Sequence, residues 1–314
     1  MKTCFILNPH SGRNRRRSWL AGTIREFISA CSCDARLVTT DGPGHATELA
    51  RAAVRAGSEV VVAVGGDGTM NEVAQGLVNT PAALALVPCG SGNGLALHLG
   101  LPRTLLPALA LATGAGGRIA AIDTGTADGR PFFNAMGLGL DADVSRRFNR
   151  LTRRGLPAYA RVAIEAWREL RPEFCRITCD GRSESLDILL IAVANSDQYG
   201  NHARIAPGAR IDDGRLDLVA IRPVGFLGAA TLVPRLFLGR LDRSPHVLRL
   251  GGSRFTIERV LPGVIHTDGE THLAAATIEV VVQPRSLRVL VPATSRAVAP
   301  AAAMAGARFA LQIS

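Results

Sequence analysis

Short apolar runs alternate with helix-like segments through the first third of this 314-residue chain. Residues 3–7, 36–40, 60–64 and 83–87 have the composition of buried strands, and helical patterns lie near 16–30, 45–56 and 69–78. Parallel strands need a crossover connection, which is usually a helix, so this alternation predicts βαβ units and a doubly wound parallel sheet. Ligands of such sheets bind at the carboxyl ends of the strands, where we expect the site.

From about Asp123 onward the pattern changes to strands separated by Asp-Gly pairs. The pairs are Asp128-Gly129, Asp180-Gly181, Asp213-Gly214 and Asp268-Gly269. Their spacing is typical of an antiparallel β region, which two helical stretches interrupt at 159–170 and 225–238. We therefore predict a Rossmann-like α/β domain over 1–122 and a mainly antiparallel β domain over 123–287. Residues 288–314 would supply a return strand to the first sheet and a tail.

The basic residues exclude several enzyme classes. Lys2 is the only lysine, so the other 35 of the 36 basic residues are arginine. P-loop NTPases, protein kinases and pyridoxal enzymes each depend on a lysine within the site, and Lys2 at the chain end is a poor candidate. The net charge of +10 favours anionic partners, either membranes or nucleic acid. Codon usage in a GC-rich genome would explain the arginine excess equally well.

The six cysteines form no Cys-x-x-Cys pair and no Cys/His set at zinc spacing, so we expect neither a metal cage nor a disulfide scaffold. The apolar run at residues 4–7 is too short for a signal peptide, which predicts a reducing, cytosolic setting. The longest uncharged stretch, 73–102, contains five glycines and three prolines. It is therefore not expected to cross a membrane.

The most informative segment places Gly65-Gly66-Asp67-Gly68-Thr69 between an apolar strand and a helix. Glycines let backbone amides approach a polyphosphate closely, and the N-terminus of the helix, which Thr69 could cap, adds a favourable dipole. This is a phosphate cradle without a lysine. Asp67 could hold Mg²⁺ or position a reacting hydroxyl. The alternative is a tight turn with no ligand.

Four further segments carry polar groups at predicted loops. Residues 88–96 repeat the glycine-rich pattern with Ser91 and Asn93, and residues 8–12 follow the first strand. The turn at 266–270 carries two carboxylates, Asp268 and Glu270, and the turn at 210–215 is also acidic. Each acidic turn could equally be a structural hairpin.

Together these segments resemble the diacylglycerol kinase catalytic-domain family, specifically bacterial soluble lipid kinases related to sphingosine kinases. The matching pieces, in family order, are Asn8-Pro9 with Ser11-Gly12, Thr40 ahead of Gly44-His45-Ala46, the loop 65–71, Gly90-Ser91-Gly92-Asn93, the segment 133–142 and Asp268-Gly269-Glu270. The Gly-Gly-Asp-Gly-Thr loop also fits NAD kinases and phosphofructokinases, whereas the Gly-Ser-Gly-Asn loop and the Asp-Gly-Glu turn favour lipid kinases. The resemblance implies a β-sandwich-like second domain and a lipid that enters along the cleft.

The resemblance also implies ATP- and Mg²⁺-dependent phosphorylation of a lipid hydroxyl. The implied nucleotide contacts are Asn8, Thr40, Gly65, Gly66, Asp67, Gly68, Thr69, Met70, Asn71, Ser91 and Asn93. Glu270 would be the general base, and Asp123 would support it. Asp67 would hold Mg²⁺ or orient the reacting hydroxyl. Sphingosine kinases give the base role to the aspartate of the glycine loop, so the opposite assignment stays open. The turn at Asp213 resembles a structural Mg²⁺ site completed by the carbonyls of Arg210 and Arg215.

Departures from the family leave the acceptor open. Many bacterial members have Thr at the position of Ser91 and Asp at the position of Gly94. The form with Ser and Gly found in this chain is closer to sphingosine kinases. A sphingoid base therefore competes with diacylglycerol, and an NAD kinase-like activity is a further alternative. Retention of Asp67, Asn93 and Glu270 argues against a catalytically silent binder. Nucleic-acid binding is not expected, because aromatic platforms are missing.

The expected partner is an anionic membrane, contacted peripherally by a cytoplasmic protein. The arginines that could bind headgroups are Arg146, Arg147, Arg150, Arg153 and Arg154. A solvated helix face is the equally good alternative for this cluster. The sequence leaves a homodimer open.

Overall fold

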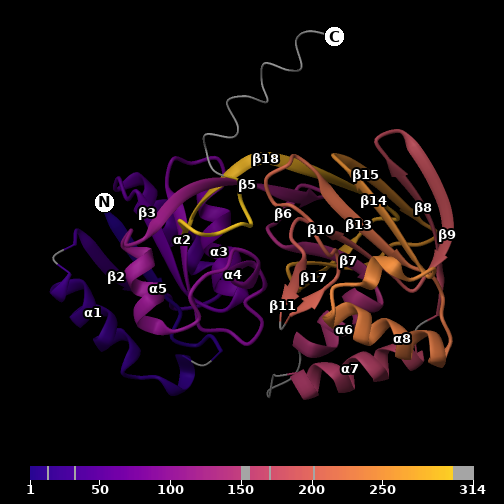
Figure 1. Cartoon of the computed structure of the whole chain (residues 1–314), viewed down its shortest axis with the longest axis horizontal. Coiled ribbons are helices and arrows are strands. Elements are labelled where there is room, and N and C mark those ends of the chain that lie inside the picture. Colours follow the sequence, from indigo (N-terminus) through magenta and orange to yellow (C-terminus); the bar gives the residue numbers. More distant parts are fainter. Residues whose placement is uncertain (13, 32, 150–155, 170, 201, 300–314) are drawn as a thin grey trace, which may run out of the picture. The chain divides into compact units, whose positions relative to one another are not determined.

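The computed structural model describes residues 1–299 except 13, 32, 150–155, 170 and 201 (Figure 1). The chain divides into two compact units: unit 1 contains Met1–Gly90, Ala96–Ile122 and Arg285–Ser314, and unit 2 contains Ser91–Leu95 and Asp123–Pro284. The end of the predicted tail, 300–314, lies outside the described residues, as do Arg150, Arg153 and Arg154.

Unit 1 is built on parallel strands in the order β2-β1-β3-β4. These strands are β1 (Thr3–Leu7), β2 (Ala35–Thr39), β3 (Val60–Gly65) and β4 (Ala83–Pro88). The connecting helices are α1 (Leu20–Ala30), α2 (His45–Arg55), α3 (Asp67–Leu77), α4 (Gly94–His98) and α5 (Leu105–Ala112), with a 3-10 turn, η1, at Asn14–Arg16. The predicted parallel α/β sheet is confirmed. Helix α1 begins later than the pattern at 16–30 suggested, because η1 precedes it.

The alternation of side chains along these strands separates two packed faces. One face carries Phe5, Val62 and Ala85 and packs against α1 and α5, which contribute Leu20 and Leu109 to the same buried cluster. Helices α2 and α3 contact β1, β3 and β4 and pack tightly against each other. At Gly76 of α3, an added Cβ would lie 2.7 Å from the Cβ of Ala50 in α2, so the closeness of the two helices requires glycine there.

Unit 2 contains two sheets that pack face to face. One has the order β14-β13-β10-β7-β16-β17, and the other runs from β18 through β15 and β8 to β9. The first sheet contains β7 (Ala135–Gly139), β10 (Leu190–Ala194), β13 (Leu216–Ile221), β14 (Val247–Gly252), β16 (Gly263–Thr267) and β17 (Glu270–Ala274). The second contains β8 (Glu173–Cys179), β9 (Arg182–Ile188), β15 (Arg254–Arg259) and the first half of β18 (Thr277–Pro292). The short strands β11 (Gln198–Gly200) and β12 (Ala203–Arg204) form a hairpin of their own.

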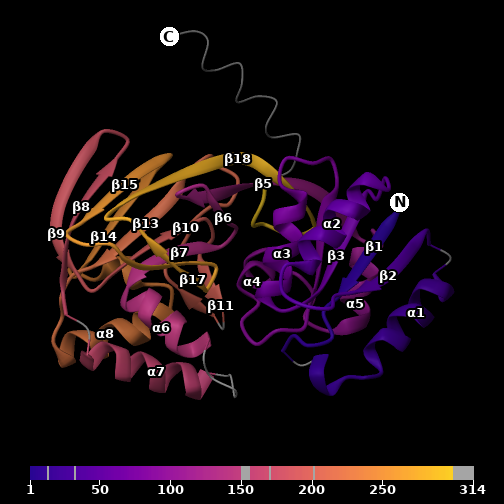
Figure 2. The ribbon, with the colours of Figure 1, turned by 180° about the vertical axis from the view of Figure 1, so that it is seen from behind.

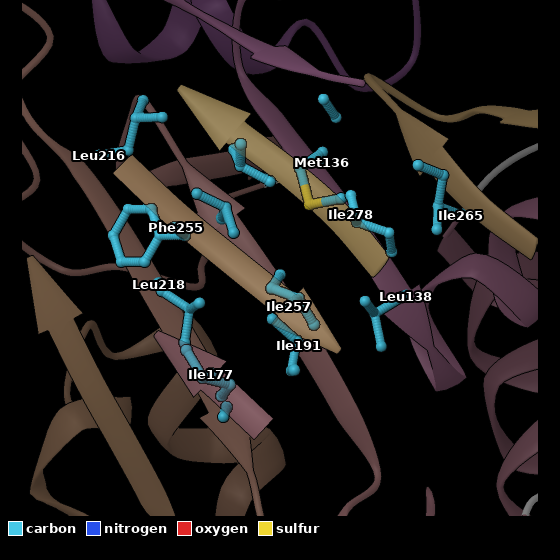
Figure 3. Packing of buried hydrophobic residues seen from close by; sticks show 14 of the residues in the cluster. Met136, Leu138, Ile177, Ile191, Leu216, Leu218, Phe255, Ile257, Ile265 and Ile278 are labelled. Atoms are coloured by element: carbon cyan, nitrogen blue, oxygen red, sulfur yellow. The ribbon is translucent and has the colours of Figure 1, made fainter. Parts of the chain in front are cut away.

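The core of unit 2 lies between these sheets (Figure 3). Met136, Leu138 and Leu218 come from the first sheet and meet Phe255 and Ile257 from the second, all completely buried. Inward positions alternate with outward ones, as in other antiparallel sandwiches. The predicted antiparallel β-sandwich is therefore confirmed.

Three of the four Asp-Gly pairs form the hairpin turns that the sequence predicted. Both residues have positive φ at 128–129, 180–181 and 268–269, which is the backbone of tight hairpins. The fourth pair differs: Asp213 has no positive φ, and Asp213-Gly214 lies in a bend before β13 and not in a hairpin. Helices α6 (Leu140–Asn149), α7 (Leu156–Glu169) and α8 (Phe226–Phe237) lie at one end of the unit 2 strands (Figure 2).

Two long strands continue from one unit to the other. Strand β5 (Gly117–Ala127) has its first part in unit 1 and its last part in unit 2, where it pairs with β6 (Arg130–Phe132). In β18, Thr277 to Val281 pair with β15, whereas Arg288 and Val289 pair in parallel with β4. Unit 1 is thus completed by residues that follow the whole of unit 2 in the sequence.

A disulfide joins Cys31 and Cys33 after α1, which the sequence analysis did not predict. The two cysteines are two residues apart, so the disulfide does not join distant parts of the chain. Cys4, Cys89 and Cys175 are buried and take no part in the disulfide. Within the described ranges, no helix combines the length and the apolar character that a membrane crossing requires.

Candidate active site

The Gly-Gly-Asp-Gly-Thr loop runs from the end of β3 into the first turn of α3. The helix begins at Asp67, and its N-cap residue, Gly66, offers no side chain. The prediction that Thr69 caps this helix was wrong, because Thr69 lies inside the first turn and its hydroxyl accepts a hydrogen bond from Nδ2 of Asn8 at 3.1 Å. An N-terminus without a capping side chain presents N–H groups and a favourable dipole to an anion.

The glycines of this loop serve different purposes. An added Cβ would lie 2.4 Å from Thr69 Oγ1 at Gly65 and 3.2 Å from Gly90 Cα at Gly66, so these positions are closed by neighbouring atoms. At Gly68, by contrast, no heavy atom lies within 4 Å of an added Cβ. The space beside Gly68 in the first turn of α3 is therefore open.

Two neighbouring loops lie against this turn. The N–H of Asn8 donates to Val64 O at 3.2 Å, and the N–H of Cys89 donates to Gly65 O at 2.7 Å. Gly12, with φ of +47°, would place a Cβ 2.9 Å from Cys89 O. The loops that follow β1, β3 and β4 are thus joined at the carboxyl ends of their strands, where a doubly wound sheet binds its ligand.

The remaining sites predicted in unit 1 are buried around these loops. Thr40 is buried, and its N–H donates to Leu7 O at 2.9 Å. Met70 and Asn71 are buried within α3, and Asn71 Oδ1 accepts from Gln75 Nε2 at 3.4 Å. Sequence reasoning missed Asn14, whose Nδ2 donates to Asn8 O at 2.9 Å and so braces the first loop. An asparagine in a polar turn gives no signal that separates this role from solvent exposure.

The Gly-Ser-Gly-Asn loop leaves unit 1 after Gly90 and belongs to unit 2. Ser91 is exposed, and Asn93 adopts a left-handed backbone with φ of +52°. An added Cβ at Gly94 would lie 2.7 Å from Nδ2 of Asn134, which itself donates to Gln198 O at 2.5 Å. A side chain at this position would therefore collide with Asn134.

Glu270 is an exposed residue at the start of β17, directly after the Asp268-Gly269 turn. Asp268 anchors this turn, since its carboxylate accepts the N–H groups of Phe133, Asn134 and Ala135 at 2.7 to 2.9 Å. Burial raises the pKa of Asp268 to about 6, against the opposing effect of these three hydrogen bonds. Asp268 therefore holds the turn, while Glu270 is the carboxylate that points outward from it.

Asp123 is buried and fixes the acidic loop at 210–215. Its Oδ2 accepts the N–H of Gly214 at 2.7 Å, and its own N–H donates to Ile211 O at 2.7 Å. Asn195 Nδ2 donates to the Asp123 carbonyl at 2.8 Å. The structure thus brings Asp123 together with the loop that carries Asp213, and places it as a support of that loop.

The Asp213 loop offers oxygen donors of the kind that Mg²⁺ prefers. One carboxylate oxygen of Asp213 accepts the N–H of Arg215 at 3.0 Å. Burial, together with the charges of Asp217 and Asp212, raises the pKa of Asp213, so a cation beside it would be stabilising. The described residues contain no group of three or more His, Cys, Asp or Glu side chains arranged as a metal site, so carbonyls would have to complete the coordination.

A relay of three side chains, of which Asp141 and His266 are buried and Tyr199 is half-buried, supports the turn before Glu270 and was not found by sequence reasoning. Tyr199 donates its hydroxyl to Asp141 Oδ2 at 2.6 Å, and His266 Nε2 lies 2.8 Å from the same oxygen. His266 Nδ1 accepts the N–H of Gly269 at 3.2 Å. An added Cβ at Gly137 would lie 2.0 Å from Asp141 Oδ2, so glycine there makes room for the relay.

Comparison with known proteins agrees with these features. The family described as "Diacylglycerol kinase catalytic domain" matches residues 2–127, and "YegS C-terminal NAD kinase beta sandwich-like domain" matches residues 134–291. The chain is 30% identical to the "Diacylglycerol kinase" of Bacillus subtilis over 276 residues, 85% of this chain and 88% of the relative. It is also 30% identical to a Pseudomonas putida protein named "Probable lipid kinase YegS-like", over 94% of this chain and 96% of the relative.

Solved structures show the same fold. A diacylglycerol kinase from Bacillus anthracis superposes with a TM-score of 0.69 at 19% identity, covering 96% of this chain and 97% of the other. An NAD kinase from Archaeoglobus fulgidus in complex with ATP superposes with a TM-score of 0.53 at 12% identity, covering 98% of both chains. Together the two family models cover most of the chain and place it in a class of kinases. Within that class the chain belongs to the family of diacylglycerol kinases and YegS-like lipid kinases.

Proposed function

We propose that the protein transfers the γ-phosphate of ATP to a lipid hydroxyl, with diacylglycerol or a related lipid as acceptor. The observation that carries this proposal is the N-terminus of α3, which has no capping side chain and has open space above Gly68. Such a terminus suits a polyphosphate in a chain whose only lysine is Lys2. The family supports a lipid as the acceptor, and a sphingoid base is the alternative.

Glu270 is the proposed general base. Its carboxylate takes the proton of the lipid hydroxyl while that oxygen attacks the γ-phosphorus, the bond from phosphorus to the bridging oxygen breaks, and ADP leaves. Two features support this role: Glu270 is exposed, and the preceding turn is held by Asp268 and by the His266 relay. A base on a fixed turn loses little conformational entropy when the acceptor binds.

Mg²⁺ is the proposed cofactor. Asp67, half-buried in the first turn of α3, offers a carboxylate beside the phosphate loop, and Asp213 offers a second one in unit 2. When bound, Mg²⁺ neutralises charge on the phosphate oxygens. Asp67 would then orient the nucleotide phosphates. Asp123 would act indirectly, because it holds the Asp213 loop.

Peripheral contact with an anionic membrane is part of the proposal, because a bilayer presents the acceptor. The arginine cluster that includes Arg146 and Arg147 supports membrane contact only weakly. Arg146 and Arg147 are both paired with Asp143, and Arg147 also lies 2.7 Å from Glu169. Cations that already have carboxylate partners offer less attraction to headgroups.

The test is transfer of labelled phosphate from ATP with Mg²⁺ to diacylglycerol, sphingosine or ceramide in mixed micelles, or to NAD in solution. We expect label in an organic-soluble product. Glu270→Gln should lower kcat by about 10²- to 10⁴-fold without changing the Mg²⁺ requirement. Asp67→Asn should instead raise the Mg²⁺ concentration needed for half-maximal rate.

Matched controls are Glu258→Gln and Asp41→Asn, which neutralise exposed carboxylates in unit 2 and unit 1. Both should leave kcat and the Mg²⁺ requirement unchanged. Label on NAD alone would replace the proposal by a small-molecule kinase. If Asp67→Asn, and not Glu270→Gln, removed the pH dependence of kcat on its acid side, the base would be Asp67.

A further inference from the structure

Helix α8 presents an apolar face to solvent. Leu227 and Leu238 are 80% and 67% exposed, and Val233 and Phe237 are 57% and 42% exposed. The opposite face of the helix is apolar as well, since Leu232 and Leu236 pack into a buried cluster with Ile221 and Leu241 of unit 2. A helix that is apolar all round is normally covered on every side, whereas this one is covered on one side only.

The exposed residues form a continuous stripe. Counting from Leu227, they recur at the three- and four-residue spacing of one helix face: Leu227, Ala230, Thr231, Pro234, Phe237 and Leu238. The stripe contains no charged residue. Thr231 is its one polar member, and its hydroxyl donates to Gly228 O. A contiguous, mainly apolar stripe on a protein surface marks a site of interaction.

Arginines flank both ends of this stripe. They are Arg222 before the helix, Arg235 in its last turn, and Arg240 and Arg243 after it, against the single acid Asp242. In the part of the chain that the structure describes, none of the four forms an ion pair, and Arg222 and Arg235 bond to the carbonyls of Pro245 and Arg243. They differ in this from Arg146 and Arg147 of α6, which are paired with carboxylates.

We infer that the exposed face of α8, flanked by these four arginines, is the surface by which the protein docks on an anionic lipid bilayer (Figure 2). Leu227, Phe237 and Leu238 enter the boundary between headgroups and acyl chains, and the arginines bind lipid phosphates. A second copy of the chain fits this face less well, since two such faces would bring eight unpaired arginines together. The inference deepens the proposed function, because it names the surface on which the acceptor is met.

The test measures binding of the full chain to vesicles by co-sedimentation. Vesicles of phosphatidylcholine with 30 mol% phosphatidylglycerol are compared with phosphatidylcholine alone, at low and high salt. We expect tight binding only to the anionic vesicles. Leu227→Ser with Leu238→Ser, and separately Arg240→Gln with Arg243→Gln, should each weaken it about 30-fold.

The matched control is Val260→Ser with Leu261→Ser, which removes two side chains of similar exposure from the turn between β15 and β16. This control should bind vesicles as the unchanged chain does. Equal loss in the control, no loss in the α8 variants, or no binding by the unchanged chain would each overturn the inference. So would a dimer in light scattering that the α8 variants dissociate.

Activity toward a dispersed short-chain diacylglycerol separates this inference from the proposed function. The α8 variants should phosphorylate that substrate at the unchanged rate while losing activity on vesicles. If the unchanged chain phosphorylates no lipid, the proposed function fails, and vesicle binding still decides whether α8 is a docking surface.

Discussion

The glycine-rich loops of unit 1, proposed to bind phosphate, and the Glu270 turn of unit 2 are built in opposite ways. In unit 1 the site is shaped by the absence of side chains, as at Gly65, Gly66 and Gly68. In unit 2 it is shaped by buried polar side chains, as at Asp268 and in the relay of Tyr199, Asp141 and His266. Backbone amides suit a ligand of fixed shape, such as the proposed polyphosphate. The proposed base, Glu270, has to be held in one orientation although the lipid acceptor varies.

This difference predicts which substitutions harm stability and which harm binding. A side chain added in unit 1 should block space, whereas a side chain removed in unit 2 should leave buried donors and acceptors without partners. The variants below test this contrast in order of their expected effect on the free energy of unfolding.

Asp268→Ala should have the largest effect. It leaves the N–H groups of Phe133, Asn134 and Ala135 without their acceptor and puts alanine at a φ of +48°. We expect a loss of about 3 kcal/mol or more in urea denaturation. Hydrogen exchange should become faster in β7 and β16, with β1 to β3 unchanged. A loss below about 1 kcal/mol would mean that the turn is not held by this carboxylate.

The pH dependence of stability should also show Asp268. Because its pKa is raised from 3.8 to about 6 in the folded chain, the unfolded chain releases this proton at lower pH than the folded chain does. The free energy of unfolding should therefore fall as pH rises from about 4 to about 6, by up to about 3 kcal/mol from this residue. Asp268→Asn removes the titration. The difference in unfolding free energy between the unchanged chain and the variant should therefore decrease as pH rises from about 4 to about 6. If this difference did not change with pH, the raised pKa of Asp268 would be contradicted.

Gly65→Ala and Gly68→Ala form a matched pair in unit 1. The first places a Cβ against Thr69 and should cost about 2 kcal/mol, whereas the second meets no atom within 4 Å and should leave stability unchanged or slightly raised. Gly68→Ala should nevertheless raise the KM for ATP about tenfold, since its methyl group enters the phosphate space. Equal KM values for Gly68→Ala and the unchanged chain would remove the argument for a phosphate above this turn.

Tyr199→Phe should have the smallest effect among the substitutions that are expected to destabilise the protein. It deletes the hydroxyl that donates to Asp141 at 2.6 Å and leaves the ring in place. We expect a loss of about 1 kcal/mol in thermal denaturation and a modest fall in kcat, with the KM for ATP unchanged. A change in the KM for ATP without a change in kcat would show that the relay serves unit 1 instead.

The same contrast explains what could be predicted from the sequence. The glycine loop was visible because its strand, turn and helix are contiguous, and only the position of the cap was wrong, since Asn8 engages Thr69 from 61 residues away. The anchoring of Asp268 and the relay were not predictable. Their partners lie 133 to 135 and 125 residues apart in the chain, and a single sequence carries no signal for such pairs.

Charge patterning was ambiguous for a related reason. The arginines near α6 formed a conspicuous run, yet Asp143 and Glu169 already pair with two of them. For residues 225–238 the sequence predicted only a helix, because an apolar side chain carries the same signal whether or not anything covers it. Burial on one side only is a property of the folded chain.

The path of β18 has a consequence for the order in which the protein can be made. Arg288 and Val289, which pair with β4, are translated after every residue of unit 2, so on the ribosome this edge of β4 stays uncovered until all of unit 2 has been synthesised. An uncovered edge strand recruits other strands, which makes the nascent chain vulnerable to aggregation during this interval. The N-terminal unit is therefore the first to be synthesised and the last to be completed. A stop codon shortly before residue 288 would damage the beginning of the protein more than its end.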